Sequence, residues 1–180
     1  ARPPIRRKPP TSYKASAPCE VWTWDITWMP GPVAGMFFYL YLIVDIFSRK
    51  IVGWEVHERE SAELTATLVR QAVLAEGCTL RPPVLHADNG SPMKGATMKV
   101  TMEKLGITAS YSRPRVSNDN PFSEALFRTC KYRPDWPNKG FATKADAQAW
   151  VKSFANWYNG QHLHRAIRFV TPDGPHARPP

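Results

Sequence analysis

The stretch Val21-Trp22-Thr23-Trp24-Asp25-Ile26-Thr27-Trp28 decides how this chain folds. Large apolar side chains alternate in it with smaller or polar ones, and a period of two is typical of a β-strand. The tryptophans therefore share one face of the strand, while Asp25 shares the other face with threonines. Burying a carboxylate there costs free energy unless a cation, an arginine or a hydrogen-bond network offsets the loss of water. Asp25 is thus either a structurally paired acid or part of a site.

Two further strand-like runs follow this stretch. Residues 36–47 are apolar and aromatic almost throughout, as expected of a central strand that is covered on both faces. Residues 51–56 return after a short reversal, and Pro30-Gly31-Pro32 predicts the first turn. The sequence therefore predicts an antiparallel meander of three strands.

Beyond residue 60 the pattern alternates between helix and strand. Ser61 can cap a helix that Gly77 ends. The remaining predicted elements are a strand over 83–87, a helix over 96–105, a strand over 107–112, a helix after residue 120 and a helix over 144–159. This order predicts a mixed α/β sheet flanked by helices. We assign it to one domain of residues 19–180.

The charge of the chain favours a polyanionic partner. The 180 residues carry a net charge of +9, with a pI of about 9.7. Nucleic acid is the first candidate and an anionic membrane surface the second. Residues 1–18 are rich in proline and basic residues, which predicts an extended segment that is either a solvated spacer or an arm along DNA. The longest apolar run, residues 36–44, is too short to span a membrane.

The cysteines and histidines give little indication of a metal site. Three widely spaced cysteines favour a reducing compartment. A structural zinc site needs several ligands at close spacing, and the five histidines do not supply it in the sequence. We therefore expect no structural zinc site.

A second carboxylate, Asp88, ends the strand-like run at residues 84–87 and precedes Asn89-Gly90. Open α/β sheets place their sites at the carboxyl ends of strands, and Asn-Gly permits a sharp turn. The alternative reading is an aspartate that only caps a loop.

A third carboxylate, Glu124, lies near the start of the helix after residue 120. Asn120 is a suitable N-cap and Pro121 suits the first helical position. Helical spacing places Glu124, Arg128 and Lys131 on one face. The alternative is an ordinary ion pair on a solvated face. The side chains expected to pack inward are Phe122, Ala125, Leu126 and Thr129.

Four motifs together carry a family resemblance. They are Trp24-Asp25-Ile26-Thr27, Asp45-Ile46-Phe47-Ser48-Arg49, His86-Ala87-Asp88-Asn89-Gly90 and Asn120-Pro121-Phe122-Ser123-Glu124. In combination they resemble the catalytic core of retroviral integrases and bacterial insertion-sequence transposases. Thirty-five residues separate Asp88 from Glu124, which matches the spacing of that family's D,D-35-E triad. The tail, Trp157-Tyr158-Asn159 with His162 and His164, is more similar to the bacterial branch.

The resemblance implies an RNase H-like fold, a five-stranded mixed sheet flanked by helices. Asp25, Asp88 and Glu124 would be the catalytic residues and the ligands of two Mg²⁺ or Mn²⁺ ions, in an enzyme that cleaves and joins DNA phosphodiester bonds during DNA integration. Asp45 would have a structural role in its hairpin. The residues expected to contact DNA are Arg128 and Lys131, with Arg113, Arg115, Asn118 and Asn120 as weaker candidates.

The resemblance also implies partners. They are the transposon ends and the target DNA, further copies of the chain in a homodimer or higher multimer, and an amino-terminal DNA-binding domain of a longer protein. The expected location is the bacterial cytoplasm, in association with the nucleoid. Two alternatives stay open: a structure-selective nuclease of the same fold, and a nucleic-acid-binding module with an inactive triad. Dependence on a divalent metal separates the binding module from both enzymes.

Overall fold

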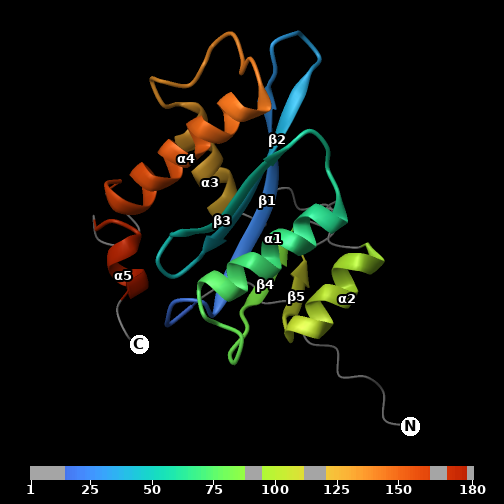
Figure 1. Ribbon diagram of the computed structural model, residues 1–180. Helices are drawn as coiled ribbons and strands as arrows, with labels where there is room; N and C mark the ends of the chain where they lie inside the picture. Colours follow the sequence, from blue (N-terminus) through green and yellow to red (C-terminus); the bar gives the residue numbers. More distant parts are fainter. Residues whose placement is uncertain (1–14, 88–94, 112–120, 163–169, 178–180) are drawn as a thin grey trace.

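A five-stranded sheet forms the centre of the computed structural model, which describes residues 15–87, 95–111, 121–162 and 170–177 (Figure 1). The strand order is β3-β2-β1-β4-β5. β1 to β3 are antiparallel neighbours, whereas β4 pairs parallel with β1 and β5 parallel with β4. The predicted meander and the mixed sheet are therefore confirmed. The strands are β1 (Val21–Pro30), β2 (Phe37–Asp45), β3 (Ile51–His57), β4 (Val84–Ala87) and β5 (Thr108–Tyr111).

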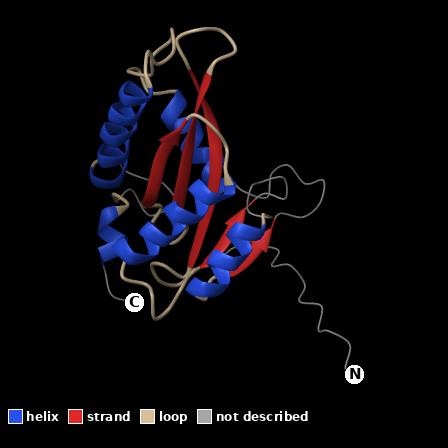
Figure 2. Cartoon of the chain, turned by 45° about the vertical axis from the view of Figure 1, so that its right-hand side comes forward, coloured by secondary structure: helices blue, strands red, loops and turns tan. Residues whose placement is uncertain are grey.

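Helices cover both faces of this sheet, as Figure 2 shows. α1 and α2 pack on one face, and α3 and α4 pack on the other. The short α5 follows near the carboxyl end of the chain (Figure 1). The helices are α1 (Ala62–Ala75), α2 (Ala96–Leu105), α3 (Pro121–Lys131), α4 (Lys144–Gly160) and α5 (Asp173–Ala177).

Alternation along β1 and β2 places successive side chains of these strands in two separate cores, one on each face of the sheet. Trp22 and Trp24 pack with Ile43 of β2 beneath α1 and α2. Leu40 and Leu42, on the opposite face of β2, belong to the core beneath α3 and α4. Because successive strand residues alternate between faces, one strand supplies apolar surface to both layers of helices. The face assigned to the tryptophans from the sequence is confirmed.

The helix boundaries follow the predicted signals. The Ser61 side chain accepts a hydrogen bond from the Leu64 backbone N–H and caps α1. Gly106 ends α2 with a φ of 70°, a left-handed conformation that glycine adopts without a steric penalty. The predicted helices and strands differ from the observed ones by one or two residues at their ends. The short α5 was not predicted from the sequence, because Gly174 and Pro175 interrupt any helical pattern there.

Among the described residues, no helix is both long and apolar enough to cross a membrane. Most of the predicted basic arm, residues 1–14, lies outside the described residues. The described part begins with a turn in which Ser16 donates backbone and side-chain hydrogen bonds to the Glu20 carboxylate, both at 2.8 Å. The predicted boundary at residue 18 stays a prediction.

Candidate active site

Asp25 lies on the face of the sheet that α3 and α4 cover. Its antiparallel partner on β2 is Leu42, whose side chain is buried in the core beneath these two helices. Directly paired residues share a face, so the Asp25 carboxylate is directed to the same side. The residue is half-buried, and its Oδ1 accepts a hydrogen bond of 2.8 Å from the Ile26 N–H.

Helix α3 runs alongside β1 on this face. Near its start, Ser123 Oγ lies 3.4 Å from Thr23 Oγ1, and at its end Lys131 Nζ donates to Thr27 Oγ1 at 2.7 Å. Eight residues of helix rise about 12 Å, and four residues of strand span about 13 Å. The helix and the strand are thus matched in length and direction, and Asp25 lies midway along the shared stretch.

Glu124 follows Ser123 directly, in the first turn of α3, and its side chain is exposed. Arg128 and Lys131 are exposed as well, so the predicted stripe of one acid and two cations is confirmed. The predicted inward face is partly wrong, because Ala125 is exposed. The buried side chains of α3 are Ser123, Leu126, Phe127 and Cys130.

The rotation of α3 has a clear physical cause. Phe127 and Cys130 join the apolar core beneath α3 and α4. Phe122 is only half-buried, and the Arg49 guanidinium lies over its ring at 4.2 Å from the centroid. This cation–π contact stabilises the Phe122 ring at the edge of the core, while the Phe127 ring lies within the core. The buried face of α3 is therefore shifted by one residue along the chain from the predicted face, and Ser123 faces β1.

The end of β4 brings a third element to the same face. Thr23 of β1 pairs with His86 of β4, and His86 is fully buried with its Nδ1 3.2 Å from Ser110 Oγ on β5. β4 ends at Ala87. The residues that lie outside the described part of the chain are Asp88, Arg113, Arg115, Asn118 and Asn120, together with His164.

Asp45 has the structural role that was expected. It is fully buried; its Oδ2 accepts hydrogen bonds from the backbone and the hydroxyl of Ser48, and its Oδ1 accepts one from the Cys19 backbone, each at 2.8 Å. Burial tends to raise the pKa of this carboxyl, but hydrogen bonds from His176, Ser48 and Cys19 hold the pKa below its usual value. Asp45 is therefore an ionised acid whose hydrogen-bonding capacity is used within the fold.

The donor set suits a hard divalent cation. Asp25 and Glu124 offer carboxylate oxygens, which Mg²⁺ and Mn²⁺ prefer to nitrogen or sulfur. The nearby polar atoms are the hydroxyls of Thr23, Ser123 and Thr27. A half-buried carboxylate on the sheet face and an exposed one on the helix packed against that face are donors that fit a hard divalent cation.

The structure also holds a cluster that could not be predicted from the sequence. Cys19, Glu76 and His176 come together so that one ligand atom of each lies within 4.8 Å of the others. The expectation from the sequence was that no structural zinc site forms, because the cysteines and histidines are not closely spaced; this cluster is built by tertiary contacts instead. The three residues are far apart in the chain, and no spacing rule connects them. His162, in contrast, packs with its ring stacked on Tyr158.

Sequence comparison matches residues 15–117 to the integrase core domain family, and residues 105–172 match a second integrase core domain description. The chain belongs to the integrase core domain family. The match includes β1, β4 and the position of Asp88, and the second match includes Glu124.

Similar curated proteins of this family come from bacterial insertion sequences. The chain is 32% identical over 165 residues to a transposase for insertion sequence element IS904 of Lactococcus lactis, covering 89% of the chain and 62% of that protein. It is 26% identical over 163 residues to the putative transposase InsK for IS150 of Escherichia coli, covering 89% of the chain and 55% of that protein. The integrase core domain chain thus spans somewhat more than half the length of these relatives.

Solved structures of retroviral integrases share the fold. A chain of a simian T-cell lymphotropic virus intasome matches with a TM-score of 0.71 at 17% identity, covering 96% of this chain and 59% of that one. The HTLV-2 integrase catalytic core domain in complex with magnesium matches with a TM-score of 0.64 at 17% identity, covering 92% of this chain and 100% of that one. The expected RNase H-like fold of this integrase core domain is confirmed.

Proposed function

We propose that this integrase core domain is the catalytic part of a DNA transposase that cleaves and joins phosphodiester bonds, with Asp25, Asp88 and Glu124 as its catalytic carboxylates. One observation carries the proposal: the Thr23–Ser123 contact brings the face of β1 that bears Asp25 next to the first turn of α3, which bears Glu124. This packing supports a site shared by two carboxylates from distant parts of the sequence in a basic domain.

The sheet supports the inclusion of Asp88. β4 lies beside β1 and runs parallel to it, and it ends at Ala87, one residue before Asp88. Parallel neighbours direct their carboxyl ends to the same edge of a sheet. One peptide unit spans only about 3.8 Å, so the chain leaves β4 close to the part of β1 that carries Asp25.

The three carboxylates would hold divalent ions, Mg²⁺ or Mn²⁺, and we propose two of them. Such a pair polarises the scissile phosphate and stabilises the attacking and departing oxygens of an in-line displacement. The contribution of the chain is to hold the carboxylates on rigid elements: Asp25 on a strand paired on both sides, and Glu124 on a helix fixed to that strand at both ends. The magnesium complex of the HTLV-2 core supports a divalent metal.

The exposed cations of α3 would contact the DNA backbone. Arg128 and Lys131 lie on the same exposed stripe as Glu124, one and two turns further along the helix. Phosphate contacts from such side chains position a duplex without reading its sequence. Arg113, Arg115 and Asn120 belong to the same proposal, because their segment leads directly into α3.

The wider assembly is part of this proposal as well. The proposed partners are transposon ends and target DNA, in a homodimer or higher multimer. The relatives are considerably longer than this chain, which supports a further DNA-binding domain in the complete protein. The bacterial sources of these relatives support a place in the bacterial cytoplasm, at the nucleoid.

The test is DNA cleavage and strand transfer on labelled duplexes in Mg²⁺ and in Mn²⁺, with this chain and with the longer protein that contains it. Glu124→Gln and Asp88→Asn should each abolish both reactions while DNA binding persists. Glu103→Gln is a matched control, because Glu103 is also an exposed helical glutamate but lies on α2.

Cleavage that survives Asp88→Asn would refute the assigned site. Cleavage without joining would favour the nuclease. Metal-independent DNA binding without cleavage by the longer protein would favour the binding module.

A further inference from the structure

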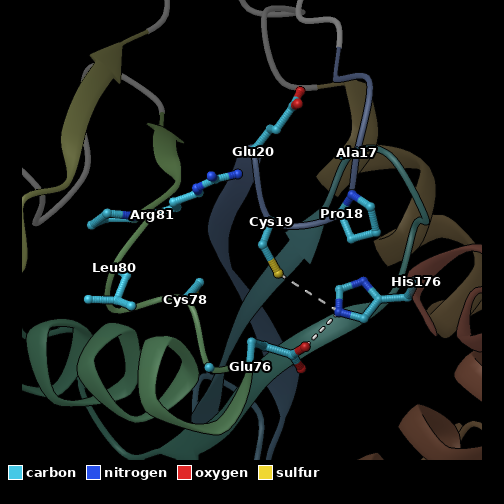
Figure 3. Close-up of a pocket in the computed structure, with 11 residues that line it drawn as sticks. Ala17, Pro18, Cys19, Glu20, Glu76, Cys78, Leu80, Arg81 and His176 are labelled. Carbon is cyan, nitrogen blue, oxygen red and sulfur yellow. Dashed lines mark hydrogen bonds and ion pairs between the residues drawn. The ribbon is translucent and has the colours of Figure 1, made fainter. Parts of the chain in front are cut away.

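Three potential metal ligands meet at the end of α1, on the side of the sheet away from Asp25. Cys19 precedes β1, Glu76 is the C-cap residue of α1, and His176 belongs to α5. His176 Nε2 lies 3.9 Å from Cys19 Sγ and 2.5 Å from Glu76 Oε2. Figure 3 shows the Cys19 sulfur and the Glu76 carboxylate both directed at the same edge of the imidazole.

The imidazole of His176 is held in one orientation. Its Nδ1 lies 2.9 Å from Ser48 Oγ and 3.6 Å from Asp45 Oδ2, both fully buried residues. With Nδ1 engaged by these groups, Nε2 is the nitrogen that faces Cys19 and Glu76. In metal-ligating histidines, the nitrogen that does not bind the metal is commonly held in this way by a hydrogen bond to a neighbouring group.

A second thiol completes the set. Cys78 is buried and lines the same pocket as Cys19, and its thiol donates a long hydrogen bond of 3.7 Å to the Val73 carbonyl. All three cysteines of the chain are free thiols. Cys78 follows Glu76 by two residues and lies on the same pocket wall as Cys19, which makes it the thiol available as a further ligand.

We propose that Cys19, Glu76 and His176 bind one Zn²⁺ ion, with Cys78 as the fourth ligand. A mixed set of sulfur, nitrogen and oxygen suits zinc, a borderline-soft cation. Zn–S bonds of about 2.3 Å and Zn–N bonds of about 2.0 Å at a tetrahedral angle put the two ligand atoms roughly 3.5 Å apart. The observed separation of 3.9 Å between Cys19 Sγ and His176 Nε2 is close to this value, whereas the 2.5 Å between His176 Nε2 and Glu76 Oε2 would have to lengthen to roughly 3.3 Å when the ion replaces the proton.

The surroundings also favour a cation. Glu76 caps the carboxyl end of α1, where the helix dipole places partial negative charge. The buried Asp45 carboxylate lies behind His176. One cation opposes binding, since Lys50 Nζ lies 3.2 Å from Glu76 Oε1, but it engages the oxygen of Glu76 that does not contact His176. An open pocket of about 790 Å³ gives access from solvent.

A proton competes with the metal for this place. His176 Nε2 and Glu76 Oε2 lie at hydrogen-bond distance, so a proton occupies the place between them. Zinc would replace the proton between Nε2 and Glu76 and the protons of the thiols, so binding should release protons. The bound ion would tie the segment before β1 and the carboxyl-terminal α5 to the end of α1, joining the two ends of the domain.

The test is titration of the reduced, metal-stripped chain with Co²⁺ as a spectroscopic probe and with Zn²⁺ as competitor, in excess Mg²⁺ so that carboxylate sites are filled. The expected result is one Co²⁺ per chain, with thiolate charge-transfer and tetrahedral ligand-field bands that one equivalent of Zn²⁺ removes. Cys19→Ser and His176→Gln should each weaken binding at least about a hundredfold, and Ser48→Ala about tenfold or more.

Matched controls separate this site from the rest of the chain. Cys130→Ala removes a buried thiol from the opposite core, and His57→Gln removes a histidine that also pairs with a glutamate, Glu55. Both variants should bind Co²⁺ as the wild type does, and so should Asp25→Asn. Circular dichroism establishes that each variant is folded. Absence of the bands in the wild type, or equal binding by folded Cys19→Ser, would overturn the proposal and leave the carboxylate site untouched.

Discussion

Asp25 and Asp45 are aspartates of two neighbouring strands, and the structure treats them in opposite ways. Asp45 is fully buried on the side of α1 and accepts three hydrogen bonds from Cys19 and Ser48. Asp25 faces α3 and is only half-buried. An acid in a strand is therefore not by itself a site. Enclosure by donors indicates a structural role, whereas partial exposure under a helix that carries a second carboxylate indicates a place for a ligand.

The strongest way to test this comparison is Asp25→Asn. We expect the substitution to reduce metal-dependent DNA cleavage at least about a thousandfold, because it removes an anionic ligand that holds the ions at the phosphate, a loss of about 4 kcal/mol of transition-state stabilisation. The free energy of unfolding should change by less than about 1 kcal/mol, since the amide can still accept the Ile26 hydrogen bond. Gel assays of cleavage and urea denaturation measure the two effects.

Asp45→Asn should show the reverse pattern. The substitution removes a buried charge that three donors and His176 stabilise, and the new amide N–H₂ faces donors instead of accepting from them. We expect a loss of about 3 kcal/mol in the free energy of unfolding. The folded fraction should cleave DNA at a rate near that of the wild type. A stable Asp45→Asn protein without cleavage activity would contradict the structural role.

Ser123→Ala tests how α3 is fixed beside Asp25. Ser123 and Thr23 are both fully buried, and the substitution removes one hydroxyl of their contact. The expected loss is about 1 kcal/mol in the free energy of unfolding, measured by urea denaturation. Ser153→Ala is the control, because Ser153 is an exposed serine of α4. If the two substitutions cost the same, the contact does not fix the helix.

The smallest expected effect is that of Lys131→Ala on DNA binding. Loss of one phosphate contact should weaken binding a few-fold and reduce the slope of log affinity against log salt by about one. Lys99→Ala, on the exposed side of α2, should leave both quantities unchanged. Fluorescence anisotropy at several salt concentrations measures them. An equal effect of both variants would mean that net charge, not the α3 stripe, binds DNA.

The sequence predicted the elements that local patterns define. The alternation around Trp22 and Trp24 predicted β1 and its two faces, and Ser61 and Gly106 predicted helix ends that the structure confirms. These features depend on neighbours within a few residues, where period and capping chemistry act directly. The family resemblance supplied what local patterns cannot, namely which distant acids belong together.

Two features depended on tertiary contacts and were missed for that reason. The rotation of α3 could not be read from its own sequence, because Phe122 and Phe127 offer apolar side chains on different faces of the helix. Tertiary contacts select one rotation, among them those of Arg49 with Phe122, of Thr23 with Ser123 and of Phe127 with the core. The Cys19 cluster joins segments from both ends of the domain, and no spacing in the sequence connects them. Asp88 stays a prediction, since it lies outside the described residues.

The central claim, that Asp25, Asp88 and Glu124 surround one metal site, can be tested by mapping the site with Fe²⁺ in place of Mg²⁺. Bound Fe²⁺ with ascorbate and peroxide cuts the protein backbone nearby, and mass spectrometry locates the cuts. We predict cuts near residues 25, 88 and 124 in the same sample, lost in excess Mg²⁺ and in Asp25→Asn. With one equivalent of Zn²⁺ added to fill the Cys19 cluster, cuts near only one of the three positions, or cuts at these positions that Mg²⁺ does not suppress, would contradict the account.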